Sequence, residues 1–483
     1  RASRRAGTYE VLTELCSRYA ASPAFRVCVG HATTVFLLRP DDIGAVLSST
    51  RFATKSSLYS ALEPLIGSGL AILAGEDYRR HRKAVTPSLH LDVLKEFAPV
   101  FYKHGQVLAD SLAARDGSVL DVVSLCGDCA NAAICETVMT TDVADDDLGR
   151  QGFLAAIPEA NKHFMFRLSR PWFLGEWAFK LSGRYAAYLD TKRALDDFTE
   201  RIIREKKSRL VAASTGTPPC AAPSTTRPPG GRLAFLDHVL CSAEGAALGD
   251  DELAAEVKTL VAIASGSSMD TLSLFLQTIA IRQDIQEAIW KEVTDVVGED
   301  ASRALSAADL QRLQYTERVF KEVLRFYSVV PLFARRSPED VRLPSGVLVP
   351  RGCHVALWLP HVHRCAEHFQ DPDEFDPDRF LPERARGRHP YAFLAFSAGP
   401  RSCVGQRYAL HFLKAVAAAL VLRLRFAVPA GGPSRPQDVP LLLNLTTCVR
   451  GGAKVLVRVR PPRPPPPGLP PRPTTPREGQ GVH

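Results

Sequence analysis

The stretch Phe396-Ser-Ala-Gly-Pro-Arg-Ser-Cys-Val-Gly405 decides what fold and chemistry to expect of this chain. Gly399 and Gly405 permit tight backbone geometry and the close approach of a flat ligand, which a Cβ atom would block. Cys403 precedes a predicted helix, whose unpaired N–H groups and dipole favour a thiolate. Arg401 can place a positive charge against an acidic group of the same ligand. The alternative is a glycine-rich loop around a buried free cysteine. The combination of Phe396, Gly399, Arg401, Cys403 and Gly405 within ten residues argues against it.

The rest of the chain is predicted to be mainly helical with a small β subdomain. Of its 483 residues, 46% are hydrophobic and 23% charged, which is ordinary globular composition. Apolar residues at helical spacing predict helices over Val93–Leu112, Tyr188–Leu210, Asp250–Arg282, Gln283–Val297, Ala307–Val330 and Gly405–Leu424. Strand or turn signals occur at Arg26–Val29, Thr33–Leu38, Pro344–Gly346 and Pro350–Gly352. We expect one large domain over residues 1–460.

Two segments are expected to lie outside the packed core. Residues 212–232 are mostly Ser, Thr, Pro, Gly and Ala and predict a disordered loop, and residues 461–483 predict a proline-rich tail.

The apolar runs are shorter than the ~20 residues of a membrane span. The chain begins without Met or an apolar leader, so we expect any anchor to precede it. The net charge of +8 falls short of a nucleic-acid-binding signature, and no nucleic-acid partner is expected.

The ten-residue stretch resembles the haem-thiolate loop of the cytochromes P450, with every position of the pattern Phe-x-x-Gly-x-Arg-x-Cys-x-Gly present. Lys321-Glu-Val-Leu-Arg325 resembles the family's Glu-x-x-Arg helix, and Asp376-Pro-Asp-Arg-Phe380 resembles its Pro-x-Arg-Phe element. Glu322 and Arg325 share one helix face, so they can pair. The resemblance implies that Arg379 completes a buried cluster with them. It also implies the family's fold, with haem b between two long buried helices.

Site residues for the haem follow from the same resemblance. Cys403 would be the ligand of the iron, with Phe396 beside the haem. The haem propionates would be bound by Arg401 and by Arg82, which lies in a segment resembling the family's Trp-x-x-x-Arg helix. Tyr78 stands where the family has that Trp, and its hydroxyl can still donate a hydrogen bond. Arg335 falls where the family commonly has a further propionate partner.

The long buried helix departs from the family pattern. The family usually has an acid followed by an alcohol beside the oxygen site, whereas this chain has Ile263-Ala-Ser-Gly-Ser-Ser-Met-Asp-Thr271. An ungapped comparison puts Gly266 at the acid position and Ser267 at the alcohol. Matching on the glycine gives Ser268 and Met269 instead. Asp270-Thr271 lies further along the helix and off that face. We therefore expect a hydroxyl without its acid.

The resemblance implies a haem-thiolate monooxygenase that inserts one atom of O2 into an apolar, lipid-like substrate. A sterol is the first expectation, because family members that lack the usual acid include sterol demethylases. A fatty-acid hydroxylase is the second, because the haem loop also resembles that branch. An isomerase or dehydratase without O2 and a haem protein that only binds remain alternatives. Azole inhibitors are expected to coordinate the iron.

The same resemblance implies partners and a location. NADPH-cytochrome P450 reductase would supply electrons, with cytochrome b5 as an additional candidate, because no flavin or nicotinamide fingerprint is present in the chain. The full-length protein is expected on the cytoplasmic face of the endoplasmic reticulum membrane. The aromatic segment Arg170–Trp177 suits a membrane surface or core packing equally. Basic residues that could face an acidic donor are Arg384, Arg386, Arg388, Arg407 and Lys414.

Overall fold

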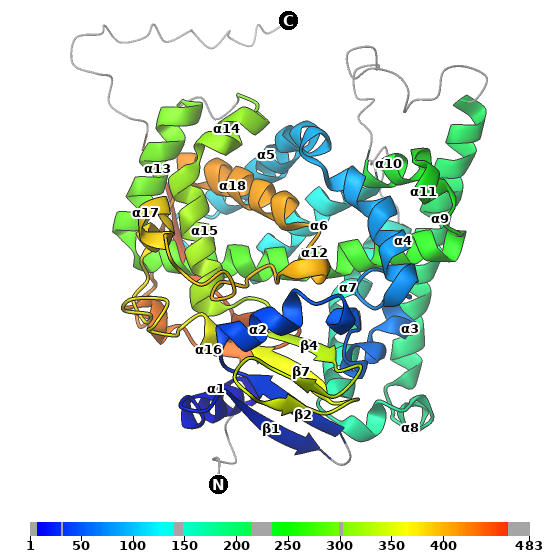
Figure 1. Cartoon of the computed structure of the whole chain (residues 1–483). Helices are drawn as coiled ribbons and strands as arrows, with labels where there is room; N and C mark the ends of the chain where they lie inside the picture. Colours follow the sequence, from blue (N-terminus) through cyan, green and yellow to red (C-terminus); the bar gives the residue numbers. More distant parts are fainter. Residues whose placement is uncertain (1–6, 30–31, 140–147, 214–233, 299–302, 462–483) are drawn as a thin grey trace, which may run out of the picture.

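The computed structural model describes residues 7–29, 32–139, 148–213, 234–298 and 303–461. Helices make up most of this part and surround one long central helix, α12 (Figure 1). The helices are α1 (Thr8–Arg18), α2 (Pro40–Leu47), α3 (Glu63–Ile66), α4 (Gly75–Val85), α5 (Leu91–Ala113), α6 (Val123–Met139), α7 (Leu148–Leu168), α8 (Glu176–Lys180), α9 (Tyr185–Ala213), α10 (Phe235–Cys241), α11 (Ala243–Ala246), α12 (Asp250–Ile281), α13 (Gln283–Val297), α14 (Ala307–Arg312), α15 (Gln314–Tyr327), α16 (Leu359–Val362), α17 (Pro382–Ala385) and α18 (Gln406–Arg423).

The strands form small sheets, the largest at the end of the molecule that carries α1 (Figure 1). This sheet has the order β1-β2-β7-β4, in which only β2 and β7 are parallel. A three-stranded sheet has the order β3-β11-β8, and β5–β6 and β9–β10 form two-stranded pairs. The strands are β1 (Ala24–Val29), β2 (Ala32–Leu37), β3 (Val119–Asp121), β4 (Leu332–Arg336), β5 (Val341–Arg342), β6 (Leu348–Val349), β7 (His354–Trp358), β8 (Leu424–Ala427), β9 (Leu441–Leu443), β10 (Thr447–Val449) and β11 (Lys454–Val459).

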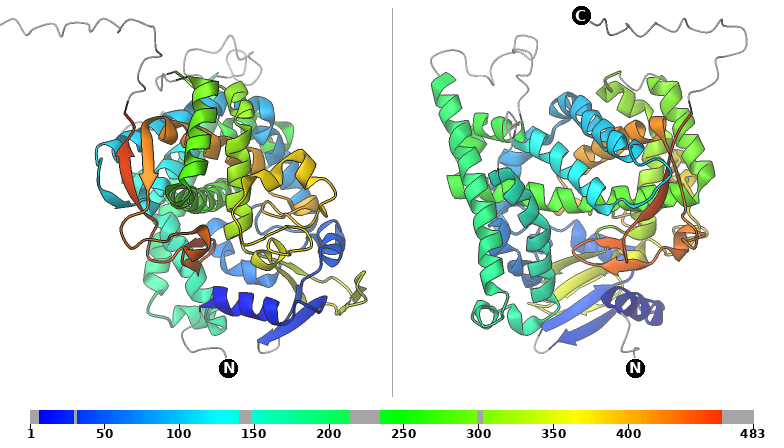
Figure 2. Two further views of the ribbon diagram at one scale, coloured as in Figure 1. Left: turned by 90° about the vertical axis from the view of Figure 1, so that its left-hand side faces the viewer. Right: turned by 180° about the vertical axis from the view of Figure 1, so that it is seen from behind.

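Helix α12 forms the middle of the core because apolar or small residues occupy all its faces over Leu260–Leu276. It packs against α6, α9 and α15, and the left view of Figure 2 looks along it. By length and composition α12 could cross a membrane, but here it runs through the fold with most of its apolar window buried. Helix α18 packs against α5, α13 and α15. The fold is thus the predicted one, with two long buried helices.

The predicted single helix over Ala307–Val330 is wrong in one respect. Leu313 has a non-helical backbone (φ −75°, ψ 70°) and separates α14 from α15. The carboxylate of Glu292 accepts hydrogen bonds from the Tyr315 and Thr316 N–H groups at 2.6 and 2.8 Å, so it caps α15 from another helix. The predicted loop 212–232 and tail 461–483 lie almost wholly outside the described residues.

Candidate active site

The loop that carries Cys403 is held by its own backbone and by a neighbouring helix. The Cys403 N–H donates to the Phe396 carbonyl at 2.9 Å, and α18 begins at Gln406, three residues on. Gly399 has φ +69°, and a Cβ there would lie 2.0 Å from the carbonyl oxygen of Leu47 in α2. Gly399 is therefore required by backbone packing against α2, and not by the approach of a ligand as the sequence suggests.

Cys403 is a free cysteine whose side chain is exposed in the loop, so its sulfur is accessible to a ligand. Burial raises the pKa of its thiol, while the Gly405 N–H and the charges of Arg82 and Lys55 oppose that rise. The start of a helix is therefore not enough to make this thiol ionise. A thiolate here needs one more positive charge, such as a metal ion bound to the sulfur.

Four cationic side chains near this loop lack a carboxylate partner. Arg335 and Arg401 are buried, and no ion pair joins either of them, Arg82 or Lys55 to an acid within the described residues. Burial lowers the pKa of Arg401 to about 10, and burial together with Arg335 and Arg401 lowers that of Lys55 well below its usual value. Buried charges are costly unless they are paired. This group of cations therefore calls for an anionic ligand.

Arg401 provides the sharpest test of fit for such a ligand. Its guanidinium lies 3.7 Å from the centre of the Tyr78 ring. Both terminal nitrogens, Nη1 and Nη2, are buried without a hydrogen-bond partner in the described part of the chain. A guanidinium with two free donors matches a carboxylate. The pairing of a free thiol with unpaired buried cations fits a metal-centred cofactor that carries carboxylates, as haem b does.

Arg82 and Tyr78 differ in how they meet the loop. Arg82 Nη1 donates to the Ser402 carbonyl at 2.7 Å and to the Tyr78 hydroxyl at 2.8 Å. The Tyr78 hydroxyl donates its single proton to the Pro400 carbonyl at 2.8 Å. Tyr78 therefore supports the loop, and its proton is not free for a propionate as the sequence suggests. Sequence reasoning missed Lys55, which reaches this place through an isolated β-bridge to Arg335.

Glu322, Arg325 and Arg379 are brought together in a fully buried cluster. Glu322 accepts from Arg325 Nε at 2.7 Å and Nη2 at 2.8 Å, and from Arg379 Nε at 3.0 Å. The remaining guanidinium N–H groups donate to backbone carbonyls, among them those of His363 at 2.9 Å and Gln370 at 2.8 Å. Because both guanidinium groups share the Glu322 carboxylate and direct their other N–H groups to backbone carbonyls, the cluster can hold the segment between α16 and the Cys403 loop in place.

The central helix turns Ser267 and Ser268 to different surroundings. Ile263 is 39% exposed although it lies in a core helix, and Ser267, one turn later, is half-buried on the same face. The Ser267 hydroxyl donates to the Ile263 carbonyl at 3.0 Å. Ser268 is buried. A Cβ at Gly266 would find only Asn161, at 3.8 Å, so the helix has room there.

Asp270 is buried and contacts the β9–β10 turn, two helical turns after Ile263 on the same side of α12. It accepts a hydrogen bond from the Thr446 hydroxyl, and its Oδ1 atom has no partner among the described residues. Burial raises the pKa of this carboxyl to about 7. Sequence reasoning set Asp270 aside and could not see this contact, because it joins α12 to a turn far along the chain.

The structure revises the basic surface predicted for a partner protein and decides between the alternatives for the aromatic segment Arg170–Trp177. Lys414 is buried and pairs with Glu317 at 2.7 Å, so it cannot face a partner protein as predicted. Trp172 and Trp177 are 65% and 76% exposed, which rules out core packing for both rings. The remaining basic residues are half-buried Arg388 and exposed Arg384, Arg386 and Arg407.

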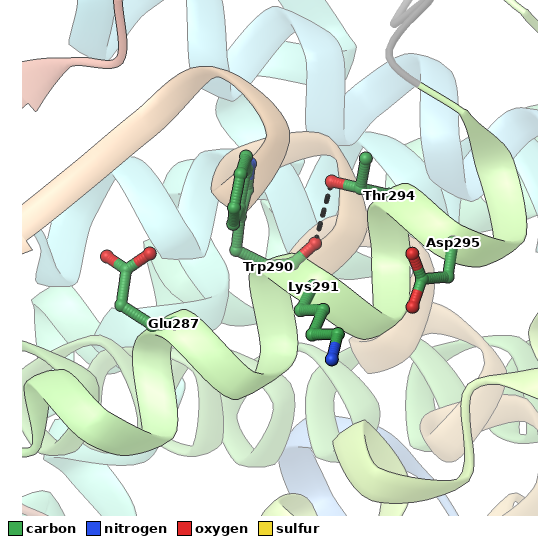
Figure 3. Close-up of a pocket in the computed structure, with 5 residues that line it drawn as sticks. All are labelled: Glu287, Trp290, Lys291, Thr294 and Asp295. Carbon is green, nitrogen blue, oxygen red and sulfur yellow. Dashed lines mark hydrogen bonds between the residues drawn. The ribbon is translucent and has the colours of Figure 1, made fainter. Parts of the chain in front are cut away.

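A separate surface pocket lies on α13 and holds none of the residues above. Its lining consists of Glu287, Trp290, Lys291, Thr294 and Asp295 (Figure 3). All belong to one helix, and the Thr294 hydroxyl donates to the Trp290 carbonyl at 2.8 Å. This pocket offers no nucleophile or buried unpaired charge, so it is not the active-site candidate.

The comparisons with known proteins agree with this geometry. A family model described as Cytochrome P450 matches residues 2–447. Cytochrome P450 4c21 of Blattella germanica is 32% identical over 418 residues, which cover 86% of this chain and 82% of the relative. Cytochrome P450 4V2 of Homo sapiens is 29% identical over 407 residues, covering 83% and 76%. The solved cytochrome P450DA heme domain superimposes with a TM-score of 0.77 at 21% identity, over 95% of this chain and 94% of that one, which shows the fold alone.

Proposed function

Because this chain belongs to the cytochrome P450 family, we propose that it is a fatty-acid hydroxylase whose haem is held by Cys403 and by the cations around Arg401. The chain is a monooxygenase of the haem-thiolate type, with haem b as its cofactor. When bound, that haem supplies the transfer of one oxygen atom from O2 to a C–H bond. The observation that carries the assignment of the site is the buried, unpartnered guanidinium of Arg401 beside the Cys403 loop.

In this proposal Cys403 Sγ binds the iron. Arg401, Arg82 and Arg335 hold the propionates. Lys55 belongs to the same group, because the charges of Arg335 and Arg401 are close enough to lower the pKa of its ammonium group. The lowered pKa values of Arg401 and Lys55 reflect charges that lack a counter-ion, so carboxylates at this place would remove that penalty. Phe396 fixes the loop through its carbonyl, which accepts the Cys403 N–H.

We assign proton delivery to the Ser267 hydroxyl, since Gly266 leaves the acid position empty. The Ser267 proton is engaged with the Ile263 carbonyl, and its oxygen can still accept a hydrogen bond from water. Loss of one proton-relay group commonly costs ~10²–10⁴-fold in rate. Ser267→Ala should therefore lower product per NADPH and raise peroxide release, whereas Ser268→Ala, at the buried position, should not. Equal coupling in wild type and Ser267→Ala would contradict this register.

Three observations support a fatty acid in place of the sterol expected first from the sequence. The two relatives described above are named cytochrome P450 4c21 and 4V2, and both names place them in the group numbered 4, in which fatty-acid hydroxylases are typical. The haem loop itself resembles that branch. The open face of α12 presents Ile263 and Ala264, which suits a long apolar chain. The lack of an acid at position 266 suggested a sterol demethylase. In this proposal it is a difference at one position of this chain and does not indicate the substrate.

A redox partner is required by the family, and we propose NADPH-cytochrome P450 reductase, with cytochrome b5 as an additional donor. Exposed Arg384, Arg386 and Arg407 can meet an acidic partner surface. Trp172, Trp177 and Leu181, which is 81% exposed, form an aromatic and apolar patch that suits the surface of a membrane. This patch supports attachment to the cytoplasmic face of the endoplasmic reticulum.

A difference-spectrum titration distinguishes the substrate classes. Purified holoenzyme is titrated with long-chain fatty acids, with matched fatty alcohols and with sterols, and the low-to-high spin change of the haem is followed. Saturable spin changes with fatty acids, followed by hydroxylated product when reductase is added, are the expected result. A response to sterols alone would overturn the substrate assignment. An azole should give a red-shifted Soret band in either case.

A further inference from the structure

A turn that follows α16 brings together three metal-binding side chains outside the active site. The Cys365 carbonyl accepts the N–H groups of His368 and Phe369, both at 3.0 Å, so residues 365–369 form a helix-like turn. Side chains three residues apart are neighbours in such a turn. One ligand atom from each of Cys365, Glu367 and His368 lies within 4.8 Å of the other two.

The three groups are free to bind an ion. Cys365 is a free thiol, and neither its sulfur nor the His368 ring has a hydrogen-bond partner within the described ranges. Glu367 has an exposed side chain whose one ion pair, to Arg39, is long at 4.0 Å. The two ring nitrogens of His368 are the atoms that can bind a metal ion there.

The turn is anchored to the core, which makes its geometry definite. Phe369 is fully buried, and the guanidinium of Arg325 lies 5.2 Å from its ring centre. Arg379 donates to the Gln370 carbonyl at 2.8 Å and to the Asp371 carbonyl at 3.2 Å. The buried cluster described above therefore holds the turn on its inner side, while the ligand groups face outward.

We propose that Cys365, Glu367 and His368 form a zinc site with an open fourth position. One thiolate, one imidazole and one carboxylate are ligands that Zn²⁺ takes in proteins, whereas Mg²⁺ and Ca²⁺ prefer oxygen alone. In a tetrahedral site ligand atoms stand roughly 3.5 Å apart. The three ligand atoms, all within 4.8 Å of one another, therefore need to approach by only about 1 Å to reach this spacing.

His389 and Asp41 lie next to the proposed zinc site. The His389 ring lies 5.9 Å from that of His368, centre to centre. His389 Nδ1 accepts the Tyr391 N–H at 3.2 Å, so its Nε2 carries the proton and donates to Asp41 at 3.2 Å.

Zinc binding to the intact holoenzyme tests the proposal. Untagged protein, treated with a chelator and then dialysed against buffered Zn²⁺ near 1 μM, is analysed for zinc and iron by mass spectrometry. We expect one zinc per haem iron, and an X-ray absorption signal with one Zn–S distance of about 2.3 Å. Cys365→Ser and His368→Ala should lose this zinc, while Cys353→Ser should retain it.

The outcomes separate a built site from a chance one. Retention of zinc by both Cys365→Ser and His368→Ala would place it elsewhere and overturn the proposal. Binding of zinc only at concentrations of about 100 μM or more would mean an adventitious ion only. If either variant loses haem, the exposed change Glu367→Gln replaces it, and undiminished zinc affinity together with an unaltered absorption signal would contradict the proposal. Failure of this test leaves the haem site untouched.

Discussion

Replacing Glu322 by alanine should remove a large share of the stability of the fold. The Glu322 carboxylate accepts three hydrogen bonds from the Arg325 and Arg379 guanidinium groups and a fourth from the Asp376 N–H at 2.9 Å. All three side chains of the cluster are buried, so bulk solvent does not screen the charges that remain. The variant leaves two guanidinium groups without a counter-charge.

Removing one partner of a buried pair typically costs ~3–5 kcal/mol, which is a large share of the ~5–15 kcal/mol that folds a domain. We therefore expect Glu322→Ala to give little haem-loaded protein and a melting temperature lowered by roughly 3–5 °C, since an unfolding entropy of ~2.1 cal/mol/K per residue makes 1 kcal/mol worth about 1 °C in a domain of this size. Haem content per protein and thermal unfolding followed by circular dichroism measure both effects.

A matched control keeps this test specific. Glu339 forms an ion pair with Arg51 at 2.7 Å, but both side chains are at least half exposed. Exposed pairs contribute ~0–1 kcal/mol, so Glu339→Ala should melt with wild type. Full haem content and wild-type melting in Glu322→Ala, or equal losses in the two variants, would refute the argument from burial.

Three further predictions concern the loop, the central helix and the surface. Gly399→Ala should abolish haem loading, measured as haem content, because its Cβ would lie 2.0 Å from the Leu47 carbonyl oxygen. Gly387→Ala is the control, because Gly387 also has a positive φ but no atom lies within 4 Å of an added Cβ. Asp270 has its carboxyl pKa raised to about 7 in the fold, so its contribution to stability is present below about pH 4 and is lost as the pH rises through 7. Asp270→Asn should therefore gain stability over wild type by up to about 4 kcal/mol at pH 8, and by much less at pH 5, in paired melting curves; an equal difference at both pH values would contradict this. Trp172→Ser with Trp177→Ser should weaken sedimentation with lipid vesicles at unchanged haem content, and undiminished sedimentation would exclude the patch.

The sequence predicted those parts of the site whose signal is local. The Cys403 loop occupies one short stretch that a resemblance can identify, and the i, i+3 spacing of Glu322 and Arg325 is enough to expect their pairing. The buried helix α12 was visible because apolar residues occupy every face. Helix α13 has the predicted bounds.

The parts that the sequence could not predict depend on contacts between distant segments. Lys55 joins the cations through a bridge to Arg335, and no local pattern signals it. Lys414 seemed available to a partner because sequence does not tell which face of α18 is covered. The break at Leu313 is capped by Glu292 from another helix, and Gly399 is dictated by the backbone of α2. Such constraints exist only once the chain is folded.

The assignment of Cys403 as the ligand of the iron is tested most directly by the carbon-monoxide difference spectrum of the reduced protein. Wild type and the control Cys353→Ser should both show the band from which the family takes its name, because that band requires a thiolate ligand, which Cys403 would supply. Cys403→Ser should lack that band, even where it retains haem through Arg401 and its neighbours. An unchanged band in Cys403→Ser would contradict the account of the site.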